Sequence, residues 1–149
     1  MSEKIISKNK KAGFQYEIFE KFTAGIVLTG SEIKSIREGQ INFVDSYCVF
    51  IGHQLFIRGL HIAEYSHGGY VNHVPVHDRK LLLNKSELSR LQKKVKEKGF
   101  TIIPMTCLLT EKGIAKIEIA ISRGKKLYDK REAIKTKDSK RDNERYEKN

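Results

Sequence analysis

The sequence predicts a mainly β fold with short helices, a small α+β protein built around a β-barrel and followed by a basic tail. The clearest strand lies around Ile117, Ile119 and Ile121, which alternate with polar or small residues at the two-residue period of a half-buried strand. Other apolar runs are short and bounded by glycines. From residue 124 onward Lys and Arg dominate, and burial there cannot offset an ordering entropy of about 1–2 kcal/mol per residue.

The N-terminal part predicts a strand and then a short helix. Phe14, Tyr16 and Ile18 alternate with polar residues, so we expect a strand from Phe14 into the apolar run that follows. Ser31 is a suitable N-cap for the next helix, and Gly39 is expected to end it.

A hairpin and a long loop occupy the middle of the chain. Residues 44–51 and 55–62 predict two paired strands, with Gly52 in the turn where a type II′ geometry needs positive φ. Residues 63–80 form a long loop, and loops of that length in a small domain are usually functional or disordered.

The C-terminal half completes the predicted barrel. Residues 81–83 form a short buried strand, and Asn84 with Glu87 begins a helix through a capping box that Gly99 should end. The next strand contains Pro104, so it should be bulged or lie at an edge. About six strands and two helices predict a closed or nearly closed barrel of the oligonucleotide-binding type.

Length and charge limit the classes of function. The 149 residues fit one domain, residues 1–123, followed by the tail 124–149. A net charge of +11 favours a nucleic-acid partner. A membrane partner is disfavoured because no apolar run approaches about 18 residues. The N-terminus lacks a signal-peptide pattern, so we expect a cytoplasmic protein with Cys48 and Cys107 as reduced thiols.

Three histidines crowd the long loop and raise the question of catalysis. His67, His73 and His77 match no metal-binding spacing, and the chain has no phosphate-binding loop or paired-carboxylate signature. A zinc site and a histidine-based nuclease are therefore the weaker interpretations, and we expect no enzyme activity, no metal and no cofactor. The loop's aromatic and histidine rings can instead stack on unpaired RNA bases, and Asn72 can bond to base edges.

The candidate RNA-binding residues combine this loop with basic positions elsewhere. For the charged helix face and for the isolated lysines, an ordinary solvated surface remains an open alternative. The candidates are Lys10, Lys11, Glu32, Lys34, Arg37, Tyr65, His67, Asn72, His73 and Lys116.

The tail carries a stripe of cations at helical spacing. We predict that it is disordered when free and helical against a polyanion, and a functionless solvated tail is the alternative. The stripe consists of Lys126, Lys130, Lys137, Arg141, Arg145 and Lys148.

Seven segments of the chain together resemble one family. In order they are NKKAGFQYEI, AGIVLTGSEIKSIREG, NFVDSY, RKLLLNKSEL, KGFTIIPM, AKIEIA and GKKLYDKR. They cover nearly the whole chain and resemble small protein B, the SsrA-binding protein family. The resemblance implies an oligonucleotide-binding-like barrel and a bacterial cytosolic role in trans-translation. Such a protein binds the tRNA-like domain of transfer-messenger RNA (tmRNA) and helps bring it to stalled 70S ribosomes.

The resemblance also implies roles for particular residues. Three positions depart from the family pattern: Thr23 replaces a frequent Glu, Val74 an acid and His77 a usual Arg. The resemblance implies that the tail enters the empty mRNA channel past the decoding centre and folds into a helix there. It also implies that the Tyr128 ring stacks on a base. We expect a monomer, and a general single-strand RNA binder or ribosomal protein of this fold is the alternative. The resemblance also places Lys116 in the tmRNA-binding surface. It adds Arg79, Lys80, Leu82, Lys125, Lys126, Tyr128, Asp129, Lys130 and Arg131 to the candidate residues.

Overall fold

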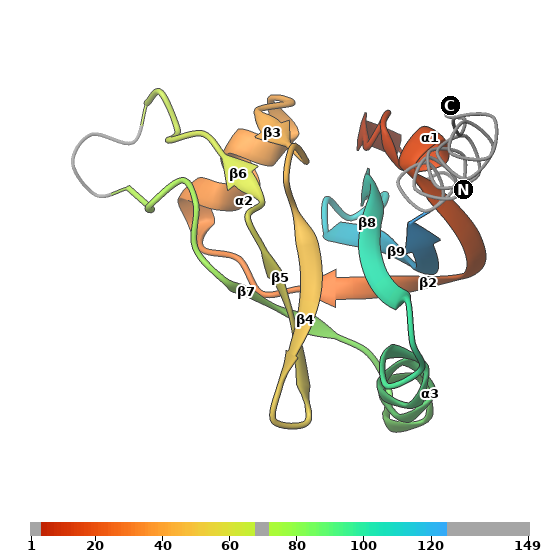
Figure 1. Cartoon of the computed structure of the whole chain (residues 1–149). Coiled ribbons are helices and arrows are strands. Elements are labelled where there is room, and N and C mark those ends of the chain that lie inside the picture. The colour runs from red at the N-terminus through yellow and green to blue at the C-terminus, as the bar shows by residue number, and fades with distance from the viewer. Residues whose placement is uncertain (1–3, 68–71, 125–149) are drawn as a thin grey trace, which may run out of the picture.

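Strands make up most of the regular secondary structure in this computed structural model, which describes residues 4–67 and 72–124 (Figure 1). The elements in chain order are β1 (Lys4–Lys8), α1 (Ala12–Gln15), β2 (Tyr16–Ile26), α2 (Gly30–Arg37), β3 (Ile41–Asn42), β4 (Tyr47–Ile51), β5 (Gln54–Arg58), β6 (His61–Ile62), β7 (Arg79–Leu82), α3 (Lys85–Val95), β8 (Phe100–Leu109) and β9 (Ala115–Gly124). The predicted mainly β fold with short helices is confirmed.

Hydrogen-bonded neighbours among these strands close into a ring. The order runs β8-β4-β5-β7-β2-β9, and β9 pairs back onto β8. All the named strand pairings in the described residues are antiparallel. Strand β1 adds to β8, while β3 and β6 form a separate two-stranded sheet. This closed order is consistent with the predicted oligonucleotide-binding-like barrel.

The core lies inside this ring. Ile117 and Ile119 of β9 are fully buried, as the alternation in the sequence predicted. Helix α3 lies below β8 and β9 in Figure 1, and its Leu91, which is also fully buried, belongs to the same apolar cluster. Burying a side chain of this size contributes about 1.5–3 kcal/mol, so α3 is an integral part of the barrel's packing.

Two irregularities of the strands occur where the sequence predicted them. Ile51 pairs with Gln54, so β4 and β5 are joined by a two-residue turn in which Gly52 has a φ of 65°. The register between β8 and β9 shifts between Pro104 and Thr106. Proline cannot donate a ladder hydrogen bond, and the bulge accommodates it within a paired strand.

Helix α3 begins as predicted and ends earlier. The Asn84 side chain accepts a hydrogen bond from the Glu87 amide at 2.9 Å, and the Glu87 carboxylate accepts one from the Asn84 amide at 3.2 Å. The helix ends at Val95, so the prediction that Gly99 ends it was wrong. Gly99 has a φ of 86° and lies in the separate turn that leads into β8.

The predicted start of the first long strand was also wrong. Phe14 lies in the short helix α1 and is 63% exposed, and β2 begins only at Tyr16. The backbone turns because the amides of Phe14 and Gln15 both donate to the Lys11 carbonyl. Ala12, which is buried, anchors this turn, so the alternation at Phe14 reflects a helical turn running into a strand.

Candidate RNA-binding surface

Leu82, Gly25 and Lys116 lie side by side across three neighbouring strands. Gly25 of β2 is opposite Leu82 of β7 on one side and opposite Lys116 of β9 on the other. We call these three residues the cross-strand row. Residues directly opposite one another point to the same face of a sheet, and the neighbours Ala24 and Ile26 are buried. The row therefore lies on the outer face of the barrel.

The cross-strand row presents an apolar side chain and a cation on either side of a glycine. Leu82 is 50% exposed, which shows that it is a surface residue and not part of the core. A Cβ at Gly25 would lie 3.4 Å from the Cβ of Leu82. The Cδ1 and Cγ atoms of Leu82 would lie 3.7 and 3.9 Å from the same Cβ, so the Leu82 side chain lies over the backbone of Gly25, beside Lys116.

The cross-strand row has an acidic neighbour on β9. Thr23, two residues before Gly25 on the same face, is opposite Glu118. A carboxylate therefore stands next to the position where the family resemblance predicts an acid and this chain has Thr23. The signal was present in the alternation of β9, which places Glu118 on the same side as Lys116.

Helix α2 begins with a capping box centred on Thr29. The Thr29 hydroxyl accepts a hydrogen bond from the Glu32 amide at 3.3 Å, and the Glu32 carboxylate accepts one from the Thr29 amide at 2.8 Å. The prediction of Ser31 as N-cap was wrong because Gly30 already belongs to the helix. The capping box turns the Glu32 side chain back toward the start of α2.

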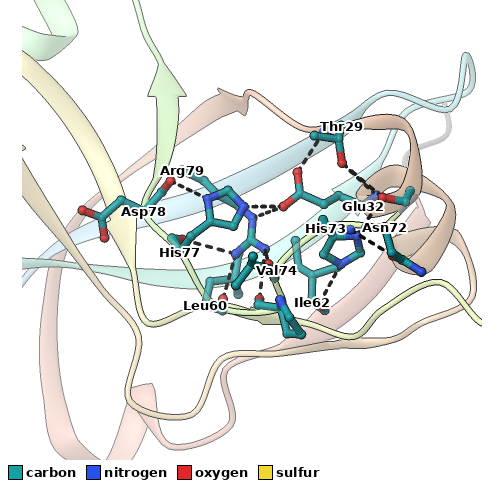
Figure 2. Close-up of polar contacts among 12 residues, drawn as sticks. Thr29, Glu32, Leu60, Ile62, Asn72, His73, Val74, His77, Asp78 and Arg79 are labelled. Atoms are coloured by element: carbon teal, nitrogen blue, oxygen red, sulfur yellow. Dashed lines mark hydrogen bonds and ion pairs between the residues drawn. The ribbon is translucent and has the colours of Figure 1, made fainter. Parts of the chain in front are cut away.

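The Glu32 carboxylate is the centre of a buried polar network, shown in Figure 2. Its Oε2 atom accepts hydrogen bonds from Arg79 Nε at 2.6 Å and pairs with His77 Nε2 at 2.7 Å. Burial alone would raise the pKa of Glu32, but the hydrogen bonds from Thr29, Arg79 and His77 outweigh it and hold that pKa below its ordinary value. The carboxylate therefore stays ionised and paired.

Arg79 ties the long loop to the rest of the barrel. Its Nη1 donates to the Leu60 carbonyl at 2.8 Å, and its Nη2 donates to the Pro75 carbonyl at 3.0 Å. The side chains of Arg79 and Glu32 are 0% and 1% exposed. Both were predicted as RNA-binding residues, but in this structure neither side chain reaches the surface. They hold the loop in place because each satisfies the other's buried charge.

Asn72 and His73 also hold the loop. The Asn72 amide group accepts a hydrogen bond from the Tyr65 amide at 3.1 Å and donates to the Tyr65 carbonyl at 2.9 Å. The ring of His73 pairs with the Ser31 hydroxyl and with the Ile62 carbonyl, each at 2.8 Å. His73 is nearly buried, so its ring fixes the loop against α2 and is not free to stack on a base as predicted.

The remaining predicted loop residues line an open cleft of about 510 Å³. Tyr65 and His67 meet edge to face with centroids 5.4 Å apart, and the Lys34 ammonium lies 5.6 Å from the centre of the Tyr65 ring. The structure thus brings Lys34, Tyr65 and His67 together from α2 and the loop. Two rings beside a cation can bind an unpaired base and its phosphate.

The sequence model of the SmpB protein family matches residues 6–149. The chain belongs to this family. A relative from Bacteroides thetaiotaomicron, called SsrA-binding protein, is 53% identical over 135 residues, which are 91% of this chain and 90% of the relative. A relative of the same name from Christiangramia forsetii is 49% identical over 148 residues, 99% of this chain and 94% of the relative.

A solved structure extends the likeness from sequence to fold. The SmpB family chain described as "tmRNA-SmpB: a journey to the center of the bacterial ribosome" aligns with a TM-score of 0.70 and 44% identity. The alignment covers 83% of this chain and 87% of that chain. The relation is therefore one of both fold and sequence over nearly the whole molecule.

The other predicted residues of this SmpB family chain are spread over the barrel. Lys10 and Lys11 line a second cleft, of about 610 Å³, between the N-terminal segment and the β3–β4 connection. Lys80 lies on the same strand and face as Leu82, two residues earlier. Arg37 donates to the Gly113 carbonyl at 3.1 Å, at the turn before β9. Outside the described residues lie Lys125, Lys126, Tyr128, Asp129, Lys130, Arg131, Lys137, Arg141 and Arg145.

Thiols and acids offer no metal centre in the described ranges 4–67 and 72–124. No group of three or more His, Cys, Asp or Glu residues there could hold a metal ion. Burial raises the pKa of Cys107 to about 12 and also raises the pKa of Cys48, so both free thiols stay protonated at neutral pH. In the same ranges, none of the helices has the length and apolar character needed to cross a membrane.

Proposed function

We infer that this protein binds tmRNA and acts with it on the bacterial ribosome in trans-translation, the rescue of stalled ribosomes. Membership of the SmpB family over residues 6–149 carries this conclusion. The 44% identity and the TM-score of 0.70 to the SmpB chain of the tmRNA complex support it, because they join likeness of sequence to likeness of fold. The role is that of an RNA-binding adaptor without catalytic activity, in the cytoplasm.

The cross-strand row is the contact that we assign to the tRNA-like domain of tmRNA. Lys116 supplies a positive charge for a phosphate, and half-exposed Leu82 supplies an apolar surface for a ribose or base. Gly25 between them leaves room for the Leu82 side chain to lie against β2, beside Lys116. Lys80 on the same face adds a second charge.

The cleft beside α2 is a second contact in this proposal. Tyr65 and His67 stack on unpaired bases of the RNA, and Lys34 contacts a neighbouring phosphate. The Glu32–Arg79 network and the hydrogen bonds of Asn72 and His73 support this contact by fixing the loop. Glu32, Arg79, Asn72 and His73 are therefore positioning residues in the proposal.

Tail residues 124–149 carry the ribosomal part of the function. Their cations face rRNA phosphates in the empty mRNA channel, and Tyr128 stacks on a base of the decoding centre. In this proposal the barrel selects the RNA, and the tail recognises the vacant mRNA channel.

The test compares two RNAs at equal salt: the tRNA-like domain of tmRNA and an unstructured RNA of the same length. An adaptor prefers the folded RNA, whereas a general single-strand binder does not. Lys116→Ala should weaken binding of the tRNA-like domain by about 1–2 kcal/mol, the loss of one charge-assisted contact. Leu82→Asp should weaken it more, because a charge replaces an apolar contact.

Lys98→Ala is the matched control, since it removes an exposed lysine from the turn after α3, away from the row. Circular dichroism should show all three variants folded, as Leu82 and Lys98 are both exposed. Equal affinity for the two RNAs, or equal effects of Lys116→Ala and Lys98→Ala, would contradict the assignment.

A further inference from the structure

A group of aromatic and cationic side chains lies at the opposite end of β9 from the cross-strand row. The guanidinium carbon of Arg123 is 4.8 Å from the centre of the Phe100 ring and 5.5 Å from that of Phe19. The Lys94 ammonium is 4.9 Å from the centre of the Phe100 ring. We call Phe19, Phe100, Arg123 and Lys94 the aromatic platform. Seven residues separate Arg123 from Lys116, about 23 Å along a strand, so the two sites are distinct.

A bulge in β2 exposes the first ring of the platform. The register between β2 and β9 shifts between Ile18 and Glu20, which makes Phe19 the extra residue of the bulge. Bulges often re-aim a side chain, and Phe19 is 48% exposed. Its ring meets Phe100 edge to face with centroids 5.1 Å apart. A large ring is thus held in a fixed orientation at the surface.

Arg123 has unused hydrogen-bonding capacity. Its Nε is buried, and among the described residues it has no hydrogen-bond partner. Glu17 is opposite Arg123 in register, yet no ion pair joins them in the described part of the chain. The two other nearby carboxylates are already paired, Glu20 with Arg90 at 2.9 Å and Glu97 with Lys94 at 3.4 Å. The protein covers Nε itself, so the terminal amino groups of the Arg123 guanidinium are the donors that remain for an acceptor outside the protein.

We propose that the aromatic platform binds one unpaired nucleotide of RNA. The base stacks on Phe19, and the Arg123 guanidinium donates to the adjoining phosphate, with Lys94 as a second cation. A half-exposed aromatic ring and an arginine whose terminal amino groups lack an acceptor are the two components of single-strand RNA sites. A purely structural cluster would not need Phe19 half exposed. This contact lies beyond the two RNA contacts assigned above and does not depend on them.

The experiment uses the full chain and a hexauridylate probe that carries a photoreactive 4-thiouridine at an internal position. Binding is measured at about 0.3 M salt, which weakens non-specific phosphate contacts of the basic tail. Irradiation and peptide mapping should place a crosslink on Phe19 or an adjacent residue of β2. Phe19→Ala should abolish that crosslink and weaken binding about 5–150-fold, the range for one stacked base. Phe19→Tyr should retain both.

Two further variants make the result specific. Ile51→Ala removes an apolar side chain at the tip of the β4–β5 hairpin that is 49% exposed, close to the 48% of Phe19. It should change neither the crosslink nor the affinity for the probe. Arg123→Lys keeps the charge but loses the planar donor fork, so it should weaken probe binding severalfold. Phe19→Ala should leave binding of the tRNA-like domain to the cross-strand row unchanged. Lys116→Ala should weaken binding of the tRNA-like domain and leave binding of the hexauridylate probe unchanged. Crosslinks that map elsewhere, or unchanged probe binding in folded Phe19→Ala, would overturn the proposal.

Discussion

The buried pair of Glu32 and Arg79 allows a quantitative test of what holds the loop in place. Glu32→Gln keeps the shape of the side chain and removes its charge. Arg79 would then remain charged and buried among neutral acceptors, the backbone carbonyls of Leu60, Pro75, Val74 and His77. Removing one partner of a buried pair costs about 3–5 kcal/mol. Since domains are stable by about 5–15 kcal/mol, the variant should lose a large share of its stability.

Urea unfolding followed by circular dichroism measures this loss. His77→Gln is the control, because His77 pairs with the same carboxylate but is 42% exposed, and exposed pairs contribute about 0–1 kcal/mol. The double variant Glu32→Gln with Arg79→Met should recover part of the stability, because no unpaired charge remains buried. A Glu32→Gln midpoint equal to that of the wild type would refute the reasoning, as would an equal loss in His77→Gln.

The same carboxylate predicts a dependence of stability on pH. The pKa of Glu32 is lowered in the folded protein from its ordinary value of 4.5. Its contribution is therefore fully present above pH 4.5 and is lost as the pH falls through the lower, folded-state pKa. The wild type should lose stability over that acidic window more steeply than Glu32→Gln. Parallel pH curves for the two proteins would show that Glu32 is not the group responsible.

Three further predictions concern charge, the tail and the thiols. The affinity for tmRNA should fall with salt, with a slope in log K against log salt of about 0.7–0.9 for each phosphate contacted; a flat titration would mean that the +11 charge is not used. Cutting the chain after Gly124 should leave tmRNA binding largely intact and abolish tagging on stalled ribosomes in a reconstituted reaction. Tyr128→Ala should give a milder tagging defect. Normal tagging by the shortened chain would reject the proposed role of the tail. Cys48 and Cys107, both buried with raised pKa values, should react with a thiol reagent only after denaturation, and rapid reaction of the native protein would contradict that.

Local features of the fold could be predicted from the sequence because their causes are local. The Asn84–Glu87 capping box, the Gly52 turn and the bulge at Pro104 each depend on residues within a few positions. The alternation of β9 could be predicted for the same reason. Where two local signals competed, the prediction was wrong, as at Ser31, whose capping role Thr29 takes.

The site was harder to predict because it depends on partners far apart in the chain. Glu32 and Arg79 are separated by 47 positions, and each alone looks like a surface charge. Only the fold shows that they neutralise one another inside the protein. The cross-strand row also joins residues that are far apart in the chain, since strand register brings Leu82 and Lys116 to either side of Gly25. The exposed Phe19 depends on a bulge that no nearby glycine or proline marks.

The pairing of β2 with β9 has a consequence for how the protein is made. Tyr16, near the start of the described chain, pairs with Gly124 at its end, and contacts between such distant segments slow folding because a long loop must close first. A nascent chain can form the β4–β5 hairpin early, but it cannot complete the ring until β9 has left the ribosome. Lys116 reaches Gly25 only in that last step. Affinity for RNA through the cross-strand row thus arises only near the end of synthesis, so an unfinished copy lacks this contact with the RNA that the finished protein binds.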